Sequence, residues 1–263
     1  MAHLNIDGIN LAFDDTGSGR PVILLHGYPF NRTLWENQVA SLKDNFRVIT
    51  PDLRGFGESD PAEPATMSRM AEDISRLMDA VDLPSATIGG LSMGGYVVLS
   101  FYKQFSNRVD ALVLADTRPQ ADTDEGKQNR VKQREQILRE GMALTADLML
   151  PKLLTPETVS TRPDVVNHVR NMIMNTKPAG AAAALLGMAN REDQTQLLPQ
   201  INVPTLIVVG REDPITPLQD SELMHQHIKG SQLIILEDAA HVANLEQSRS
   251  FNGVLKYFLG KLN

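Results

Sequence analysis

The chain contains no cysteine, which excludes disulfide bonds, zinc–cysteine sites and thiol nucleophiles. It has no excess of basic residues, because 25 lysines and arginines stand against 32 aspartates and glutamates, for a net charge of −7. A dedicated nucleic-acid binder would show the opposite balance. Apolar runs such as Val22–Leu25 and Leu206–Val209 are far too short to span a membrane, and the N-terminus has no secretory signal pattern. We therefore expect a cytoplasmic protein that binds neither nucleic acid nor a membrane.

Aromatic residues are missing from a long internal stretch of the chain. No phenylalanine, tyrosine or tryptophan lies between Ser106 and Ser250. Any aromatic ring near a functional site must therefore come from the residues before or after this stretch. The apolar walls that the stretch itself can supply are leucine, alanine and methionine, and such flexible aliphatic walls suit aliphatic ligands of varied length.

The first part of the chain alternates β-rich runs with helical patterns. Short apolar runs typical of buried strands cover residues 22–25, 47–50, 86–88, 110–115, 204–210 and 232–236. Apolar residues spaced by three and four predict an amphipathic helix over 67–82, and a second helix follows over 93–105. This alternation predicts an α/β fold with a mostly parallel sheet and helices on both of its faces.

The alternation stops over residues 117–200, which are rich in good helix formers. Helices are predicted at about 124–140, 142–150, 163–175 and 178–190, with Pro151, Pro156, Pro163 and Pro178 separating them. After this segment the alternation resumes, with a helix near 217–228 and a C-terminal helix from about Asn244. We therefore divide the chain into a first core part (1–116), a helical insertion (117–200) and a second core part (201–263).

The sharpest motif is Gly90-Leu91-Ser92-Met93-Gly94, which has the pattern G-x-S-x-G. It lies between a predicted strand and a predicted helix, where a tight turn forces the serine into a strained backbone conformation. The flanking glycines leave room for that turn, and the following helix N-terminus favours developing negative charge. The context predicts that Ser92 is a nucleophile rather than an incidental turn residue.

A serine hydroxyl needs a general base, and histidine is the usual one. His241 lies in a loop after the predicted strand 232–236, and loops after parallel strands gather at the edge of the sheet that also carries Ser92. The other histidines are His3, His26, His168, His225 and His227. Of these, His3, His168, His225 and His227 are expected to be solvated. We therefore expect His241 to be the base.

The carboxylate that orients the base should come from another loop at the same edge. Asp213 follows the strand 204–210, and the order Ser92, Asp213, His241 is that of hydrolase-fold enzymes. Glu212 is the less suitable neighbour. Asp116, after the preceding core strand, stays an alternative.

These motifs resemble the α/β-hydrolase superfamily over essentially the whole chain. The resemblance implies a mostly parallel, eight-stranded sheet, with the insertion serving as a helical cap between the sixth and seventh strands. His26-Gly27-Tyr28-Pro29 is similar to the family's HG-x-P loop, which implies that the backbone N–H groups of Tyr28 and Met93 form the oxyanion hole. His26 would hold that loop. The stretch 52–59 is similar to the family's D-x-R-G-x-G-x-S loop and is interpreted as scaffold, since no phosphate-binding Lys-Ser/Thr follows it.

The serine at the nucleophile position separates the chain from haloalkane dehalogenases and epoxide hydrolases, which attack with aspartate. The chain is similar to carboxylesterases, to 3-oxoadipate enol-lactonase-like enzymes and to cofactor-free haloperoxidases and perhydrolases. The resemblance implies hydrolysis of a small-molecule carboxylic ester or lactone through an acyl-enzyme, with neither metal nor cofactor. Perhydrolysis at the same site and a non-catalytic, ligand-sensing role remain alternatives.

The substrate pocket is the least specified part of the prediction. Trp35 is expected on its core side, and Met142, Leu185 and Met188 on the side of the insertion. These side chains favour an aliphatic acyl group. An anionic substrate would need a positioned arginine, for which the candidates are Arg118, Arg162, Arg170 and Arg191. Each of these is more typical of a solvated helix face.

Overall fold

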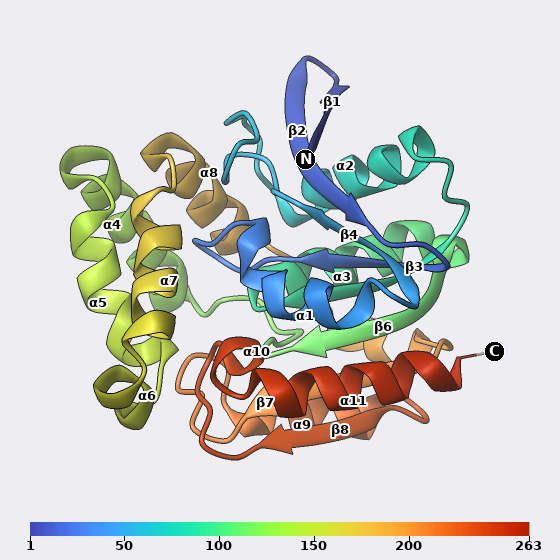
Figure 1. Ribbon diagram of the computed structural model, residues 1–263. Coiled ribbons are helices and arrows are strands. Elements are labelled where there is room, and N and C mark those ends of the chain that lie inside the picture. The colour runs from blue at the N-terminus through green and yellow to red at the C-terminus, as the bar shows by residue number, and fades with distance from the viewer. Residues whose placement is uncertain (263) are drawn as a thin grey trace.

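One eight-stranded sheet organises the protein in the computed structural model, which describes residues 1–262 (Figure 1). The strands are β1 (Ala2–Ile6), β2 (Ile9–Thr16), β3 (Arg20–Leu25), β4 (Phe46–Pro51), β5 (Ala86–Leu91), β6 (Val109–Ala115), β7 (Thr205–Gly210) and β8 (Gln232–Leu236). Their order across the sheet is β1-β2-β4-β3-β5-β6-β7-β8. Strand β2 runs antiparallel to both of its neighbours, and all other pairings are parallel. The predicted fold class is confirmed.

The central strands are buried on both faces, because helices cover both sides. Every residue of β5 and β7 is buried, which explains their continuous apolar runs. The pairing aligns the carboxyl ends: Leu25 pairs with Gly90, Ala115 with Val208, and Gly210 with Leu236. The loops that follow β3, β5, β6, β7 and β8 therefore leave the sheet along one edge.

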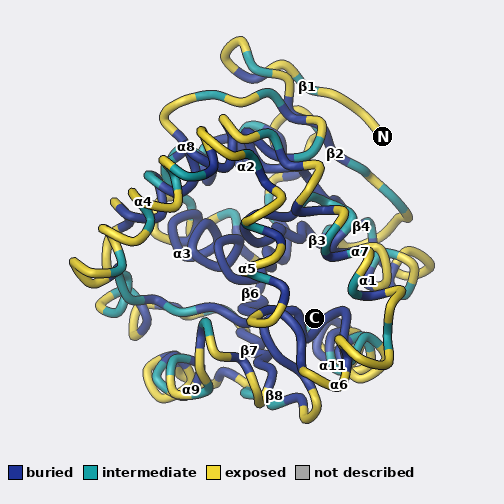
Figure 2. Tube along the Cα trace, turned by 90° about the vertical axis from the view of Figure 1, so that its left-hand side faces the viewer, coloured by how far each residue is buried: buried dark blue, intermediate teal, exposed yellow. Residues whose placement is uncertain are grey.

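The helices of the core cover the two faces of the sheet. They are α1 (Glu36–Leu42), α2 (Met67–Ala80), α3 (Met93–Phe105), α9 (Leu218–His227), α10 (Ala243–Glu246) and α11 (Ser248–Lys261), with short 3₁₀ helices η1 (Arg32–Trp35) and η2 (Ser106–Arg108). In Figure 1, α1 and α11 lie in front of the sheet, and α2 and α3 lie behind it. Helix α3 is buried along almost its whole length (Figure 2). The predicted C-terminal helix is two helices, because the chain leaves helical geometry at Gln247.

Between β6 and β7 the chain forms the helical insertion, on the left of Figure 1. Its helices are α4 (Asp124–Glu140), α5 (Ala143–Leu153), α6 (Pro156–Thr161), α7 (Pro163–Met174), α8 (Pro178–Ala189) and η3 (Thr195–Gln200). Four of the α-helices lie close to their predicted ranges. The expectation that Pro151 separates two helices is wrong, because α5 continues through it to Leu153. Helix α6 was not predicted; Pro156 begins it, and proline is favoured in a first helical turn because it lacks an N–H.

Helix α8 packs backbone to backbone against the core. A Cβ on Gly180 would lie 1.8 Å from the carbonyl oxygen of Gly55, and a Cβ on Gly187 would lie 1.9 Å from that of Ala65. Only glycine permits these approaches. By contrast, α4 is exposed along most of its length, and Ile137 is its one fully buried residue (Figure 2). In residues 1–262 we find no helix that is both long and apolar enough to cross a bilayer.

Candidate active site

A serine occupies the tight turn between β5 and α3. Ser92 has φ 55° and ψ −116°, a conformation that a residue with a side chain seldom adopts. The turn requires its glycines, because a Cβ on Gly90 would lie 2.3 Å from the carbonyl carbon of Gly94. A Cβ on Gly94 would lie 2.3 Å from the carbonyl oxygen of Leu25. The G-x-S-x-G spacing therefore places Ser92 at the N-terminus of α3.

The structure brings Ser92, Asp213 and His241 together from the loops after β5, β7 and β8. The Nε2 atom of His241 lies 2.8 Å from Oγ of Ser92, and its Nδ1 atom lies 2.8 Å from Oδ2 of Asp213. All three side chains are buried. A carboxylate can only accept a hydrogen bond, so Nδ1 of His241 carries the ring proton and donates a hydrogen bond to Asp213. The lone pair of Nε2 is then free to accept the Ser92 hydroxyl.

Asp213 is held in its ionised form by its surroundings. Burial by itself would raise the pKa of this carboxyl, but His241 and nearby donors hold the pKa below its usual value. The Thr216 hydroxyl donates to Oδ2 at 2.6 Å, and the Ile215 N–H donates to Oδ1 at 2.8 Å. The carboxylate is thus fixed in orientation as well as in charge.

The alternative acids do not contact His241. Glu212 is exposed, and Asp238 occupies a left-handed position in its loop, with φ 53°. Asp116 is fully buried: its Oδ1 accepts the Gly210 N–H at 2.8 Å, and its Oδ2 has no hydrogen-bond partner among the described residues. Burial, followed by the negative charge of Asp213, raises the pKa of Asp116 well above its usual value. The geometry therefore selects Asp213 as the partner of His241.

Two backbone N–H groups beside Ser92 are free. The loop after β3 passes close to the serine, because a Cβ on Gly27 would lie 3.2 Å from the Ser92 Cβ. Within residues 1–262, neither the Tyr28 nor the Met93 N–H donates to a protein acceptor outside the helices and strands. Met93 is the first residue of α3, where N–H groups point away from the helix. Both groups are thus available to an oxygen bound beside Ser92.

His26 holds this loop in place. Its Nδ1 lies 2.8 Å from the carbonyl oxygen of Gly27, and its Nε2 accepts the Leu53 N–H at 3.0 Å. Burial lowers the pKa of His26, which keeps the ring neutral and suits one donor and one acceptor nitrogen. The ring also meets Phe56 edge to face, at 5.2 Å between centroids. His26 therefore connects the loops after β3 and β4.

The four expected pocket residues are all buried. Trp35 and Leu185 are fully enclosed, and Met142 and Met188 are nearly so. Trp35 packs against Phe251 of α11, with 6.0 Å between ring centroids. The role of these four side chains in substrate binding stays a prediction.

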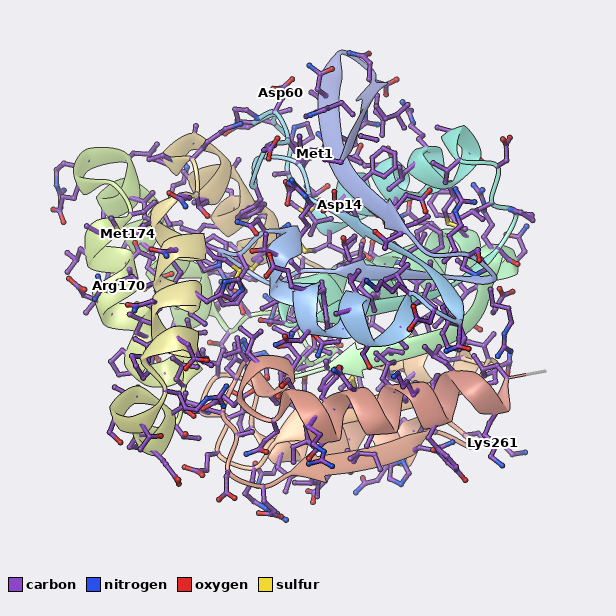
Figure 3. The ribbon with its side chains drawn as sticks, viewed as in Figure 1. Met1, Asp14, Asp60, Arg170, Met174 and Lys261 are labelled. Carbon is purple, nitrogen blue, oxygen red and sulfur yellow. The ribbon has the colours of Figure 1, made fainter. Side chains whose placement is uncertain are left out.

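The arginine candidates mostly bind acids of the protein itself. Arg191 pairs with the buried Asp122 at 2.8 Å, and Arg118 lies 3.7 Å from the same carboxylate, which Arg130 also binds. Arg170, on α7 in Figure 3, pairs with Asp147 at 2.6 Å. Arg162 donates to the Glu246 carbonyl at 3.2 Å. Over the described part of the chain, no group of three or more histidine, aspartate or glutamate side chains is placed to hold a metal ion.

The glycine-rich loop after β4 is bonded to itself and to its neighbours. The Ser59 hydroxyl donates to the Asp52 carbonyl at 2.7 Å, and the Asp52 carboxylate accepts the Glu58 N–H at 2.9 Å. Arg54 forms a buried ion pair with Asp73 at 2.6 Å. These contacts agree with the interpretation of the loop as scaffold.

Sequence reasoning missed three polar residues around the site. Thr216 binds Asp213, Thr117 donates to the Ser92 carbonyl at 2.8 Å, and Glu246 binds the loop before His241. The position of Thr216 three residues after Asp213 is a turn signal that could have identified it. His168 was expected to be solvated, but it is half-buried, with Nε2 3.3 Å from the Thr33 carbonyl oxygen, because α7 packs against η1.

Comparison with known proteins identifies the fold family of the chain. A family profile described as the alpha/beta hydrolase fold matches residues 20–248. An esterase from Thermogutta terrifontis, solved with malate bound, is 43% identical and has a TM-score of 0.95, covering 97% of this chain and 94% of that chain. The 3-oxoadipate enol-lactonase 1 of Acinetobacter baylyi (strain ATCC 33305 / BD413 / ADP1) is 30% identical over 226 residues, which are 86% of this chain and 83% of the relative. A bromoperoxidase from Bacillus anthracis is 25% identical, with a TM-score of 0.89, and the match covers 99% of both chains.

The eight-stranded sheet, the strained serine turn and the matched profile lead to one assignment. The chain belongs to the α/β-hydrolase fold family.

Proposed function

We propose that the protein is a serine hydrolase that cleaves carboxylic esters or lactones through an acyl-enzyme. The hydrogen-bonded series from Ser92 through His241 to Asp213 carries this proposal. His241 Nε2 takes the hydroxyl proton as Ser92 Oγ attacks the carbonyl carbon, and Asp213 stabilises the imidazolium that forms. The tetrahedral intermediate collapses, and His241 gives the proton to the leaving alcohol. Water then attacks the acyl-enzyme by the same steps; for a lactone, the alcohol stays attached to the acyl group.

The free N–H groups of Tyr28 and Met93 would bind the oxyanion of the tetrahedral intermediate. A carbonyl oxygen becomes negatively charged as it turns tetrahedral, and fixed donors stabilise that charge by about 3 kcal/mol each. Both donors belong to the backbone and are therefore held without a side chain that must be ordered. Because Met93 opens α3, the helix dipole adds to this stabilisation.

The relatives support a hydrolase of this kind. The Thermogutta terrifontis protein is an esterase, and the Acinetobacter baylyi protein is an enol-lactonase. We propose that residues 117–200 form a cap and that Trp35, Met142, Leu185 and Met188 shape a mainly aliphatic pocket. The lack of aromatic residues in the insertion supports a preference for aliphatic acyl groups.

A panel of p-nitrophenyl esters of increasing acyl length, together with simple and acyl-homoserine lactones, tests this function. We expect many turnovers per enzyme on short acyl esters. Ser92→Ala should fold normally and lose roughly 10⁴- to 10⁶-fold in kcat. Ser100 is a buried serine within α3, and the control variant Ser100→Ala should keep the wild-type rate. Sustained turnover by Ser92→Ala would refute the proposal, and a single slow event in the wild type would instead favour a ligand sensor.

Perhydrolysis is a second candidate, favoured by the likeness to a bromoperoxidase. The same acyl-enzyme would be attacked by hydrogen peroxide in place of water, giving a peroxyacid and free Ser92. Both routes share every residue named above. Measuring peroxyacid formation from peroxide and a short carboxylic acid, beside ester hydrolysis without peroxide, separates the two.

A further inference from the structure

A second buried carboxylate lies close to His241 without touching it. Glu246 ends α10, five positions after the histidine, and is only 5% exposed. Both of its oxygens have donors. Oε2 accepts the Ala240 N–H at 2.7 Å, and Oε1 accepts the Thr155 N–H at 2.8 Å and the Thr155 hydroxyl at 3.0 Å. A buried carboxylate requires such hydrogen-bond donors, so Glu246 holds in place the two residues that supply them, Ala240 and Thr155.

The donors come from two distant parts of the chain. Ala240 immediately precedes His241 in the loop after β8. Thr155 lies in the helical insertion, where it is the N-cap residue of α6 and its side chain also accepts the Thr158 N–H at 3.1 Å. Glu246 therefore joins the backbone on one side of His241 to the junction between α5 and α6.

The other side of His241 is bound to the same junction. Val242, the next residue, donates its N–H to the Leu153 carbonyl oxygen at 3.2 Å. Leu153 is the last residue of α5, two positions before Thr155. Residues 153–155 thus hold the backbone on both sides of His241. On one side Val242 donates directly to Leu153. On the other side Glu246 links Ala240 to Thr155.

We infer that Glu246 is a positioning residue that sets His241 against the α5–α6 junction of the insertion, so that the insertion helps to place the general base. This inference rests on the proposed function. Glu246 does not act on the substrate in it, because its oxygens are occupied by Ala240 and Thr155. A shift of about 1 Å in a catalytic group can cost about 100-fold in rate, so a loosened loop should show in kcat.

Glu246→Gln and Thr155→Ala test the two ends of this connection. Glutamine offers one acceptor oxygen and cannot accept from both partners, and alanine removes the Thr155 hydroxyl. We expect each variant to lose about 10- to 100-fold in kcat on a short p-nitrophenyl ester, with KM within about twofold of wild type. Thr155→Ser keeps the hydroxyl and should restore kcat.

Thr123→Ala is the matched control. Thr123 is the N-cap residue of α4 in the same insertion and accepts the Gly126 N–H at 3.1 Å, as Thr155 does for α6. Its loss removes a helix cap of similar kind, worth about 1 kcal/mol of stability, from an exposed site. We expect a lower Tm with kcat unchanged.

Wild-type kcat in folded Glu246→Gln and Thr155→Ala would overturn the inference, even if their Tm falls. Equal losses of kcat in Thr155→Ala and Thr123→Ala would also overturn it, because loss of a cap alone would then explain the effect. If Glu246→Gln does not fold, Thr155→Ala and Thr155→Ser still decide the matter. The proposed function fails separately, through turnover that survives Ser92→Ala.

Discussion

The Nδ1 atom of His241 lies 2.8 Å from Oδ2 of Asp213, and both side chains are shielded from water. Because both groups are buried, the hydrogen bond to the Asp213 carboxylate determines that Nδ1 of His241 carries the ring proton. In the proposed mechanism the carboxylate would also stabilise the imidazolium that forms when His241 takes the serine proton. The proposed mechanism depends on both effects.

Asp213→Asn should therefore lower kcat by about 10³- to 10⁴-fold while the protein stays folded. The amide NH₂ would donate to Nδ1, leaving the proton on Nε2, where it blocks acceptance from Ser92. Asp238→Asn, in the loop before His241, should keep full activity because asparagine tolerates its left-handed backbone. Steady-state kinetics with circular dichroism would check both. Full activity in Asp213→Asn would show that another acid serves His241.

Asp116→Asn should raise stability at neutral pH. Burial raises the pKa of this carboxyl in the folded state, so ionisation costs stability as the pH climbs above the unfolded value of about 3.9. Asparagine keeps an acceptor for the Gly210 N–H and suits the left-handed φ of 42°. We expect a gain of about 1 kcal/mol, or roughly 2–4 °C in Tm, at neutral pH.

The gain should vanish at acid pH, where the wild-type carboxyl is protonated in both states. Asp110→Asn, at an exposed site on β6, the strand that Asp116 follows, is the control and should change Tm little at any pH. Thermal scans from neutral to acid pH would measure this. A constant or reversed difference between Asp116→Asn and wild type would contradict the assigned burial effect.

Gly94→Ala should prevent folding or destabilise the protein by at least about 3 kcal/mol, because its Cβ would lie 2.3 Å from the Leu25 carbonyl oxygen. Gly253→Ala is the contrasting change: this residue of α11 has nothing within 4 Å of an added Cβ. There alanine should stabilise the helix by about 0.5–1 kcal/mol. Denaturant titration of both variants tests the contrast, and a stable Gly94→Ala protein would be at odds with the described turn.

Asp122→Asn should destabilise the fold by about 3 kcal/mol, because it leaves Arg118, Arg130 and Arg191 around an uncharged group. Burial acts to raise the pKa of Asp122, but Arg130 and Arg191 hold it below its usual value. The wild type therefore loses this stability as the pH falls below the unfolded pKa of about 3.9. The difference in free energy of unfolding between wild type and Asp122→Asn then becomes smaller.

The exposed pair of Asp147 with Arg170 supplies the comparison for Asp122. Asp147→Asn should cost at most about 1 kcal/mol. Urea unfolding at neutral and acid pH would measure both variants. If Asp122→Asn and Asp147→Asn lower the free energy of unfolding equally, the burial of Asp122 does not make its ion pairs more important for stability.

The sequence indicated strands β3 to β8 and the proximity of Ser92, Asp213 and His241, because both depend on local patterns. Apolar runs identify strands, and parallel strands place their following loops on one edge. The link between Glu246 and Thr155 could not be predicted, since it joins residues 91 positions apart through side chains whose burial depends on how the insertion docks. Helix α6 is not indicated by the sequence for a local reason: proline usually separates helices, whereas Pro156 is the first residue of this one.

Trp35 is the chain's one tryptophan, so its fluorescence reports on a single place. That place is informative, because Trp35 belongs to η1, whose Thr33 carbonyl lies 3.3 Å from Nε2 of His168 on the insertion. Excited selectively, the indole should emit at short wavelength and resist quenching by acrylamide while the insertion is docked. Red-shifted, quenchable emission on ligand binding would record separation of the insertion from the core without any added label.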